Sequence, residues 1–451
     1  MVSPARACAF AVVRRVFEQD AYADRALGGE AAGLDPRERA LAMTLVYGTV
    51  QRRATLDHVA AALSSRPLSG LDPPVLAALR LGLLQLLFLD GIADHAAVHE
   101  SVELAKLGGR GGSGLVNAVL RRAVREGRAI LDSLSDESPA EAAILHSVPL
   151  WLAELWWQEL GPVQARALLR RVNDPAESAL RVNTLVAGVD EVLAKLPVPA
   201  HTVPELPEAL VLDAPFDLHG SELWRRGAIM AQSRGSMLAG RALAPRHGDR
   251  VLDLCAAPGA KTTQLAALLG DDGQLVAVER HPGRARALQA TVARMHVSCA
   301  TVEIGDAARP PGDSPGGSGG WGEGGGYDAV LVDPPCSGLG TLQSRPDLRW
   351  RTSPARIAEL AGLQARILHA AAQATAPGGA LVYSVCTISR AEEEGVVQTF
   401  LAQHPDFTTE DLSGQLPEAG DGPFLRLFPH REGTDGFFIA RLRRDDAAGS
   451  R

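Results

Sequence analysis

Apolar residues recur with a helical period over the first part of the chain. Residues 76–89 are apolar on successive turns, and Asp-Pro-Pro at 72–74 is typical of a helix start. Two more helices are expected within residues 93–128, separated by the glycine-rich run 108–112. The pattern predicts an all-α domain over residues 1–135.

From about residue 248 onward, short apolar runs alternate with helical ones. The apolar runs are typical of buried strands: residues 250–255, 274–279, 300–304, 328–333 and 380–386. Such alternation predicts the α/β class, with a parallel, doubly wound, Rossmann-like sheet. A run rich in Gly, Pro and Ser, residues 309–326, predicts a flexible insertion before the fourth strand.

The segment between these regions begins with a polar stretch, residues 132–139, that indicates a linker. Tryptophans and arginines follow it. A tryptophan-rich helix packs into a core more often than it stacks on bases, so we expect the rings to pack and the arginines to contact RNA. These residues are Trp151, Trp156, Trp157, Arg166, Arg170 and Arg171. The predicted organisation is a helical domain (1–135), a linking, RNA-contacting subdomain (140–245) and a catalytic domain (246–445).

Composition narrows the class of protein. The chain has 451 residues, of which 46% are hydrophobic, enough for two or three domains with their own cores. No apolar run approaches the roughly 18 residues of a membrane span and the N-terminus lacks a signal-peptide core, so we expect a cytoplasmic protein without membrane contact. The five cysteines are odd in number and lack CxxC spacing, which argues against disulfides and against a metal site. We also expect a monomer.

Charge gives local rather than global signals. The net charge of −8 does not indicate nucleic acid, but local basic patches bind phosphates whatever the sum. Arg52-Arg53 and Arg121-Arg122 are such patches in the helical region, although charged residues on a helix more often form a solvated face. Only three of the 45 basic residues are lysines, and Lys261 lies in a Pro-Gly-Ala-Lys loop, which favours a role for its compact ammonium group.

A tight turn, Cys-Ala-Ala-Pro-Gly-Ala at residues 255–260, joins the first predicted strand to a helix. Such a turn brings backbone N–H groups close to a ligand at a helix N-terminus, but it lacks the spacing of a phosphate loop and the third glycine of a dinucleotide loop. Glu279 ends the next strand about 20 residues later, where an acid holds ribose hydroxyls. Asp306 follows the third strand, in reach of an adenine amine.

Two acids at successive strand ends, without a phosphate cradle, favour S-adenosylmethionine as the cofactor. The cofactor contacts predicted from these features are Cys255, Ala256, Ala257, Pro258, Gly259, Ala260, Lys261, Glu279 and Asp306.

Two cysteines follow the last two predicted strands. Cys336 lies in the run Asp-Pro-Pro-Cys-Ser-Gly-Leu-Gly (333–340), and Cys386 ends the run Leu-Val-Tyr-Ser-Val-Cys (381–386). Because the carboxyl ends of parallel strands share one edge, both thiols should meet the turn there. A single cysteine is usually a small buried residue, which is the interpretation kept for Cys8, Cys255 and Cys299. Their shared context favours chemistry for Cys336 and Cys386.

These motifs resemble the RNA (cytosine-5)-methyltransferases, specifically the RsmB (Sun/Fmu) family of bacterial ribosomal RNA enzymes. The resemblance rests on Asp-Leu-Cys-Ala-Ala-Pro-Gly-x-Lys-Thr, Asp-x-Pro-Cys-Ser-Gly-x-Gly, Arg-Pro-Asp-Leu-Arg-Trp at 345–350, Tyr-Ser-x-Cys, and Asp-Gly-Phe-Phe-Ile-Ala-Arg at 435–441. The first half is similar to the NusB-like, RNA-binding helical domain of that family, so the resemblance covers nearly the whole chain. It implies S-adenosylmethionine-dependent C5 methylation of a cytosine in 16S rRNA.

The family's chemistry gives the two thiols different tasks. Cytosine C5 is a poor nucleophile, so a thiolate first adds to C6, and C5 then attacks the sulfonium methyl group. The resemblance implies that Cys386 is this nucleophile and that Cys336 assists its release after the C5 proton is lost. Asp333 is suited to hydrogen-bond the cytosine N3 edge and, by resemblance, borders the cofactor. Lys261 is expected to steady the base or the cofactor.

Other functions remain open. A tRNA (cytosine-5)-methyltransferase is one, because looped bases are recognised by pocket contacts that the sequence does not show. The run 333–336 also approaches the [DN]-Pro-Pro-aromatic motif of amino-group methyltransferases, but cysteine does not stack on a base and such an enzyme needs no Cys386. A non-catalytic NusB-like RNA-binding protein is disfavoured by the intact motifs.

Overall fold

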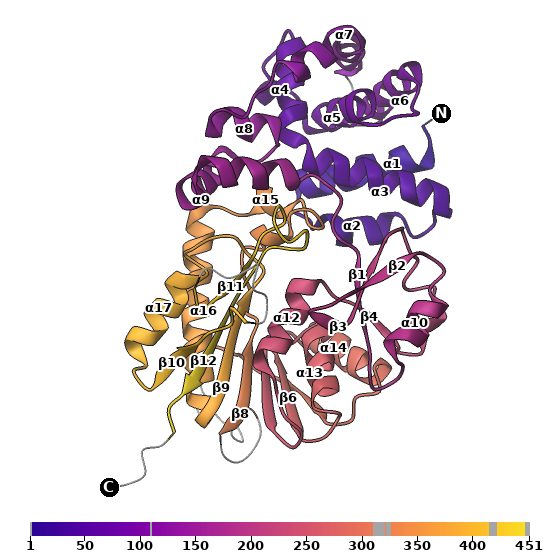
Figure 1. The fold of residues 1–451 in the computed structure, drawn as a ribbon. Helices are drawn as coiled ribbons and strands as arrows, with labels where there is room; N and C mark the ends of the chain where they lie inside the picture. Colours follow the sequence, from indigo (N-terminus) through magenta and orange to yellow (C-terminus); the bar gives the residue numbers. More distant parts are fainter. Residues whose placement is uncertain (1, 109–110, 310–320, 322–325, 415–421, 447–451) are drawn as a thin grey trace. The chain divides into compact units, whose positions relative to one another are not determined.

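The chain divides into two compact units. Unit 1 comprises residues 1–175 and 342–353, and unit 2 comprises residues 176–341 and 354–451. The structure, a computed structural model, describes residues 2–108, 111–309, 321, 326–414 and 422–446 (Figure 1). Most of the insertion expected at 309–326 therefore lies outside the described residues. No helix in the described ranges has the length and apolar character needed to span a membrane.

Unit 1 is helical wherever it is described. Its elements are α1 (Pro4–Glu18), α2 (Ala23–Glu30), α3 (Pro36–Gln51), α4 (Arg53–Leu63), the 3₁₀ turn η1 (Leu68–Gly70), α5 (Pro73–Phe88), α6 (Asp94–Leu107), α7 (Ser113–Asp132), α8 (Pro139–Leu145), α9 (Leu150–Arg171) and α15 (Leu348–Arg351). Proline starts α1, α3, α5 and α8, since its fixed φ suits a first turn and its missing N–H is not needed there. Asp35 caps α3 by accepting the N–H groups of Arg37 and Glu38, each at 2.9 Å.

Helix α5 is the centre of unit 1. It is apolar on all sides, and Leu79, Leu81, Leu83 and Leu84 are at most 1% exposed because α1, α3, α4, α6 and α7 pack around it. The predicted all-α domain and the helix start at 72–74 are confirmed. In the expected linker, Asp136 is buried and accepts bonds from Arg170 Nε at 2.9 Å and His146 Nε2 at 3.2 Å.

Residues 342–353 pack among the unit 1 helices, although in the sequence they follow the fourth predicted strand (328–333). Arg349 is fully buried, and its Nη1 donates to the carbonyl of Ser147 at 3.0 Å and to Asn173 Oδ1 at 2.8 Å. Trp350 Nε1 donates to the carbonyl of Val50 at 2.7 Å. A buried guanidinium is tolerated where such acceptors surround it, so these contacts fix the segment in unit 1.

Unit 2 contains two sheets. The smaller is antiparallel, in the order β2-β3-β1-β4, from β1 (Ala179–Val182), β2 (Ala200–Val203), β3 (Leu206–Leu212) and β4 (Ile229–Ala231). Helices α10 (Val189–Lys195) and α11 (Glu222–Arg225) accompany it. Buried Arg181 of β1 connects this sheet to the helix that follows β5, because its Nη2 donates to Thr263 Oγ1 at 2.7 Å.

The larger sheet has eight strands in the described residues, in the order β10-β12-β9-β8-β5-β6-β7, with β11 paired to β12. The strands are β5 (Arg250–Leu254), β6 (Gln274–Glu279), β7 (Ala300–Ile304), β8 (Tyr327–Val332), β9 (Thr375–Val385), β10 (Phe407–Glu410), β11 (Leu425–Leu427) and β12 (Phe437–Arg444). Strands β5 to β9 are parallel, as predicted. The sheet continues beyond the five predicted strands at one edge, where β12 pairs antiparallel to β9 and in turn carries β10 and β11.

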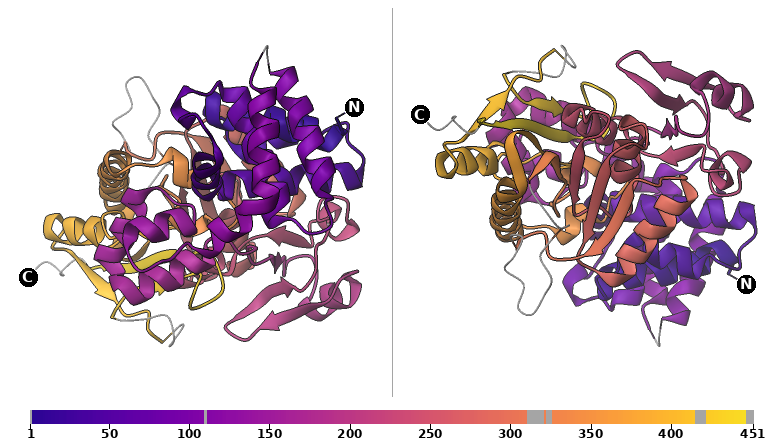
Figure 2. Two further views of the ribbon diagram at one scale, coloured as in Figure 1. Left: turned by 90° about the horizontal axis from the view of Figure 1, so that it is seen from above. Right: turned by 90° about the horizontal axis from the view of Figure 1, so that it is seen from below.

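Helices cover both faces of this sheet (Figures 1 and 2). One face packs against α12 (Arg234–Leu243), α13 (Ala260–Leu268) and α14 (Pro282–Arg294), and the other against α16 (Pro354–Ala374) and α17 (Glu394–Gln403). The apolar side chains of each strand therefore point into one of two cores, which explains their continuous apolar runs. The Rossmann-like α/β fold is confirmed.

Candidate active site

The predicted site residues follow the carboxyl ends of the parallel strands. The turn at 255–259 follows β5, Glu279 ends β6, and Asp306 follows β7. Asp333 comes directly after β8, and Cys386 directly after β9. The parallel register places all five ends at one edge of the sheet, the usual ligand edge of such folds.

The two thiols predicted to act together are in contact. The Sγ atoms of Cys336 and Cys386 lie 3.4 Å apart. The hydrogen bond with Cys386, followed by burial, raises the pKa of Cys336 well above its ordinary value. Cys336 therefore stays a thiol at neutral pH, and its S–H can donate toward the sulfur of Cys386.

Lys261 and Asp333 form an ion pair beside the thiols. Lys261 Nζ donates to Asp333 Oδ2 at 2.8 Å, and Ser384 Oγ donates to Asp333 Oδ1 at 3.3 Å. Burial lowers the pKa of Lys261, but the attraction of Asp333 outweighs it and the pKa is raised overall. Lys261 thus stays an ammonium although its side chain is only 10% exposed, and it fixes the orientation of the Asp333 carboxylate.

Glu392, which sequence reasoning missed, ties the two cysteine loops together. It is fully buried; its Oε1 accepts the backbone N–H of Ser337 at 2.9 Å and Gln364 Nε2 at 2.9 Å. Its Oε2 accepts the hydroxyls of Ser337 and of Thr387, the latter at 3.3 Å. Ser337 follows Cys336 and Thr387 follows Cys386, so one carboxylate holds the neighbours of both thiols.

Glycine closes the loop that carries Cys336. Gly340 N donates to the carbonyl of Cys386 at 3.1 Å, and Gly436 N donates to the carbonyl of Gly340 at 2.8 Å. A Cβ at Gly340 would collide with the carbonyl oxygen of Gly436, so this close backbone approach requires glycine. These contacts join three motifs of the resemblance: the run 333–340, the run that ends at Cys386, and the run 435–441.

A cavity of about 90 Å³ opens at the ends of β5, β6 and β7. Of the predicted cofactor contacts, Cys255, Glu279 and Asp306 line it. Glu279 Oε1 accepts the N–H of His281 at 2.9 Å, which fixes the carboxylate at the cavity wall. Lining residues that the sequence did not reveal are Val278, Arg280, His281, Arg284, Ala307, Pro335, Leu363 and Ile367. Arg284 on α14 and Leu363 and Ile367 on α16 belong to no sequence motif, so the spacing of motifs did not predict them.

The turn after β5 shapes this region. Gly259 has φ of +104°, and a Cβ there would lie 2.8 Å from Leu288 Cδ1, so glycine is required. The N–H groups of Ala256 and Gly259 are bonded within the protein, to the carbonyls of Val278 and Ala256 at 3.0 and 2.9 Å. Ala256, Ala257, Pro258, Gly259, Ala260 and Lys261 do not line the cavity, so the turn contributes shape there rather than a row of donors.

Asp253, near the end of β5, has one buried carboxylate oxygen without a partner among the described residues. Its Oδ2 accepts the hydroxyl of Thr262 at 2.6 Å, and Oδ1 is the oxygen without a partner. Burial raises the pKa of Asp253 to about 7. The orphaned oxygen and the carboxylates of Glu279 and Asp306 fit the hydroxyl and amine donors of a nucleoside, and therefore S-adenosylmethionine.

The arginines assigned to RNA contact in the linking segment have carboxylate partners. Arg166 Nη1 lies 3.1 Å from Glu137 Oε2, and Arg171 Nη1 lies 2.9 Å from Asp174 Oδ2. Arg170 is paired with Asp136. Contact of these arginines with RNA therefore stays a prediction. The packing of the tryptophan-rich helix is confirmed at Trp156, which is fully buried.

A doubly wound sheet with a nucleoside-type cavity and catalytic-type residues at the same edge defines the class of S-adenosylmethionine-dependent methyltransferases. Residues 240–443 match the family model of the 16S rRNA methyltransferase RsmB/F, residues 3–125 match the NusB family, and residues 148–219 match the RsmF/B-like ferredoxin-like domain. The chain belongs to the RsmB/F family of rRNA methyltransferases.

Relatives match almost the full length. The probable ribosomal RNA small subunit methyltransferase B of Synechocystis sp. is 35% identical over 98% of this chain and 99% of its own. The ribosomal RNA small subunit methyltransferase B of Thermus thermophilus is 38% identical over 90% of this chain and 89% of its own. Among solved structures, PH0851 is 27% identical, with a TM-score of 0.81 over 98% of this chain and 99% of that one.

Proposed function

We propose that the protein methylates C5 of a cytosine in small-subunit rRNA, and that Cys386 forms a covalent bond to C6 of that base. The observation that carries the proposal is the contact of the two thiols, 3.4 Å apart, beside the Lys261–Asp333 pair. The names of the Synechocystis and Thermus thermophilus relatives support the small subunit as the substrate. An amino-group methyltransferase has no use for a second thiol at this position.

In the first step, the Cys386 thiolate adds to C6. The C6–S bond forms, the C5=C6 π bond breaks, and negative charge develops on C5 and the N3 edge. The Asp333 carboxylate accepts a hydrogen bond from the amino group on the N3 edge, and the positive charge of Lys261 stabilises the developing negative charge. S-adenosylmethionine, when bound, supplies an electrophilic methyl group.

In the last step, the thiol leaves. The C5 proton passes to a water molecule, the electrons of the C–H bond re-form C5=C6, and the electrons of the C6–S bond return to Cys386. Cys336 stays protonated, so its S–H is placed to donate to the sulfur of Cys386 as negative charge returns there.

The position of the methyl group tests the proposed reaction. Unmethylated 16S rRNA and a tRNA pool would each be incubated with the protein and methyl-labelled cofactor, then digested to nucleosides for mass spectrometry. We expect label in 5-methylcytidine from 16S rRNA. Label in N4-methylcytidine would contradict the covalent route, and label in tRNA alone would assign the substrate to the alternative class.

Four further expectations are retained as proposals. The three domains act as a NusB-like RNA-binding domain (1–135), a linking subdomain (140–245) and a catalytic domain (246–445). The protein acts as a monomer, in the cytoplasm, and without a metal ion.

A further inference from the structure

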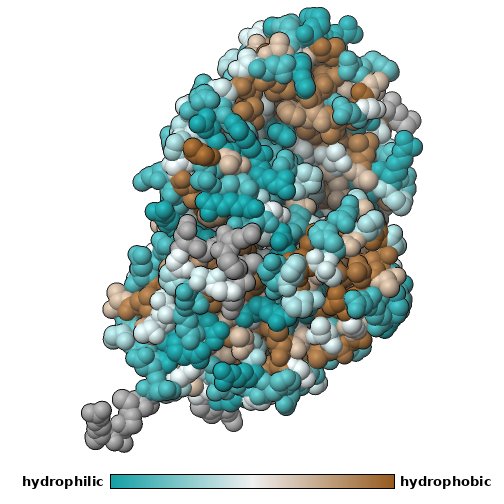
Figure 3. Space-filling model, in the orientation of Figure 1, coloured by the Kyte–Doolittle hydropathy of each residue, from teal (hydrophilic) through white to brown (hydrophobic). Residues whose placement is uncertain are grey.

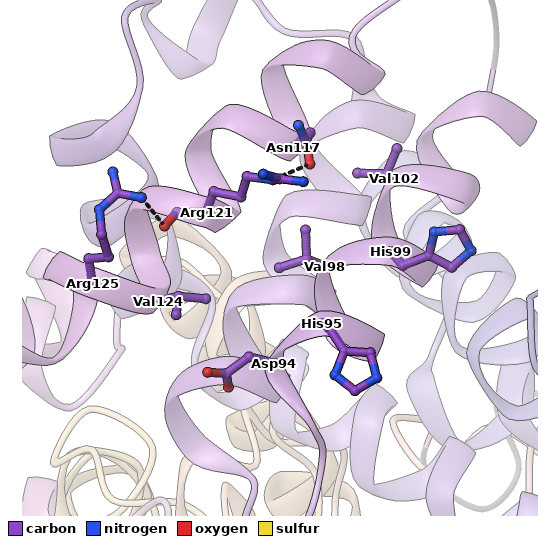
Figure 4. Close-up of a pocket in the computed structure, with 9 residues that line it drawn as sticks. All are labelled: Asp94, His95, Val98, His99, Val102, Asn117, Arg121, Val124 and Arg125. Atoms are coloured by element: carbon purple, nitrogen blue, oxygen red, sulfur yellow. Dashed lines mark hydrogen bonds between the residues drawn. The ribbon is translucent and has the colours of Figure 1, made fainter.

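A groove on unit 1 lies between α6 and α7, within the helical domain that is proposed to bind RNA but for which no binding surface was named above. We call it the α6–α7 groove; it encloses about 440 Å³ (Figure 4). It is lined by Asp94, His95, Val98, His99, Val102, Asn117, Arg121, Val124 and Arg125.

Two guanidinium groups at this groove have weak carboxylate pairing or none among the described residues. Arg121 Nε donates to Asn117 Oδ1 at 3.1 Å, and Arg121 has no carboxylate partner among the described residues. Arg125 Nη1 donates to the carbonyl of Arg121 at 3.0 Å (Figure 4). The carboxylate nearest to Arg125 is that of Glu126, at 3.7 Å, and Arg122 already holds it at 2.6 Å. Both arginines are therefore oriented by neutral oxygens and keep their charge for a ligand.

The other arginine pair that the sequence suggested for RNA is packed. The guanidinium of Arg52 lies 4.9 Å from the ring centroid of Phe88, and that of Arg53 lies 4.9 Å from Phe17 and 5.0 Å from Trp350. Such stacking favours a structural role for this pair. The available basic pair in this part of unit 1 is Arg121 with Arg125, one helical turn apart, and not Arg121 with Arg122.

Apolar side chains line the groove beside these charges. Val98 and Val102 come from α6, and Val124 from α7, where it is 44% exposed. In the space-filling view, brown apolar atoms lie among polar ones over the part of unit 1 that carries α5, α6 and α7 (Figure 3). Asp94 is the one carboxylate in the lining, so the arginines outnumber it.

We propose that the α6–α7 groove binds single-stranded RNA, with backbone phosphates on Arg121 and Arg125 and a ribose or base against the valines. Positive charge next to apolar surface complements a nucleotide, which carries both an anion and a flat, weakly polar ring. The inference rests on the proposed function only in taking RNA as the substrate. Its test measures binding and needs no methyl transfer.

The salt dependence of RNA binding tests the groove. The full-length protein would be titrated with a fluorescent, unstructured single-stranded fragment of 16S rRNA at several salt concentrations. Each phosphate contact contributes about 0.7 to the slope of log K against log salt for single strands. Arg121→Gln with Arg125→Gln should therefore lower the slope by about 1.4. Asn117→Asp, which gives Arg121 a carboxylate partner, should lower it by up to about 0.7.

A matched control keeps the result specific. Arg37→Gln with Arg39→Gln removes the same charge from two exposed arginines of α3 that do not line the groove. We expect this control to keep the wild-type slope. An unchanged slope in both groove variants, or an equal fall in the control, would overturn the proposal. If the double variant does not fold, as judged by its melting temperature, Asn117→Asp decides alone.

Binding and catalysis are separable in this design. The groove variants should still form 5-methylcytidine at low salt, because they leave the cysteine site intact. Normal RNA binding in a protein that makes no 5-methylcytidine would instead count against the proposed function and leave the groove in place.

Discussion

The chemistry of single residues depends here on which groups are kept neutral by burial. Burial raises the pKa of Cys8 and Cys255, and it raises that of Cys299 to about 12. The pKa of Cys336 is raised chiefly by its bond to Cys386. Cys386 is the sulfur that accepts this bond and that has the Lys261 ammonium group nearby.

Alkylation should distinguish these thiols. Thiolates react and thiols do not, and the pKa values of the other four cysteines are all raised. Iodoacetamide at pH 7.5 should therefore modify Cys386 before any other cysteine. Peptide mass spectrometry over time would measure the order. Since each pKa unit changes the thiolate fraction about tenfold, Cys299 should react far more slowly. Faster modification of Cys336 or Cys299 than of Cys386 would contradict the assignment.

Asp253 should make stability depend on pH. Its pKa, raised by burial to about 7, exceeds the unfolded value near 3.8. A carboxyl group with a raised folded pKa gives its full stabilisation below the unfolded pKa and loses it as the pH rises through the folded one. The cofactor-free protein should thus lose stability between pH 5 and pH 7.5, and Asp253→Asn should lose less. The free energy of unfolding of both proteins would be measured by urea titration across this pH range. The same pH dependence in both would rule out the raised pKa of Asp253.

At the scale of elements, the loops after β8 and β9 are held as one piece. Glu392 bonds the residues next to both cysteines, and Tyr383 OH donates to the carbonyl of Glu392 at 2.6 Å. Gln364 of α16 donates to the same carboxylate. The separation of the two sulfurs is therefore set by a buried network outside the reacting atoms.

Glu392→Ala should disturb both loops. Removing the buried carboxylate leaves several donors unpaired, which should cost about 3 kcal/mol or more in the free energy of unfolding. Cofactor affinity should change little, because Glu392 does not line the cavity at β5 to β7. The measurements are urea unfolding, calorimetry with the cofactor and the rate of methyl transfer. Glu359→Gln, at an exposed position of α16, is the control. Wild-type stability and rate in Glu392→Ala would show that the network does not position the thiols.

The sequence predicted the strands well and the loops poorly. Strands β5, β6 and β8 follow continuous apolar runs, which are typical of buried strands between amphipathic helices. Glu392 lies in Arg-Ala-Glu-Glu-Glu, a run that is typical of a solvated surface. Only the folded loops show that this carboxylate is buried. The antiparallel edge was missed because nothing in β10 or β12 specifies a partner strand.

At the scale of the whole molecule, each of the two units is built from two separate stretches of the chain. The chain leaves unit 2 after the loop of Cys336, enters unit 1 at Leu342 and returns at Pro354. Arg349 and Trp350 hold this excursion through acceptors on α3 and near α8 and α9. Hydrophobic periodicity predicts helices and strands but not which unit a segment joins. The sequence therefore showed residues 345–350 as a family motif without indicating that they pack in unit 1.

Arg349 should therefore stabilise unit 1. Burial lowers its pKa to about 9, but it remains charged at neutral pH. Arg349→Met should leave buried carbonyls unpaired and lower the free energy of unfolding by about 3 kcal/mol. Tryptophan fluorescence in urea would measure the loss. Arg345→Gln, in the same segment but exposed, is the control and should unfold like the wild type. Equal stability of Arg349→Met and the control would show that the hydrogen bonds of Arg349 are dispensable.

Removal of residues 1–130 would also remove Val50, the acceptor of Trp350 Nε1. Point variants are therefore the cleaner test of RNA binding.

The covalent role of Cys386 is the central claim, and trapping the adduct tests it most directly. Each cysteine variant would be incubated with 16S rRNA and S-adenosylmethionine and run on a denaturing gel. Cys336→Ala keeps the nucleophile but loses the S–H that assists release, so it should give a retarded protein–RNA band. Cys386→Ala should give neither band nor product. A band with Cys386→Ala and none with Cys336→Ala would reverse the two roles, and full activity without a band in either variant would contradict the covalent mechanism.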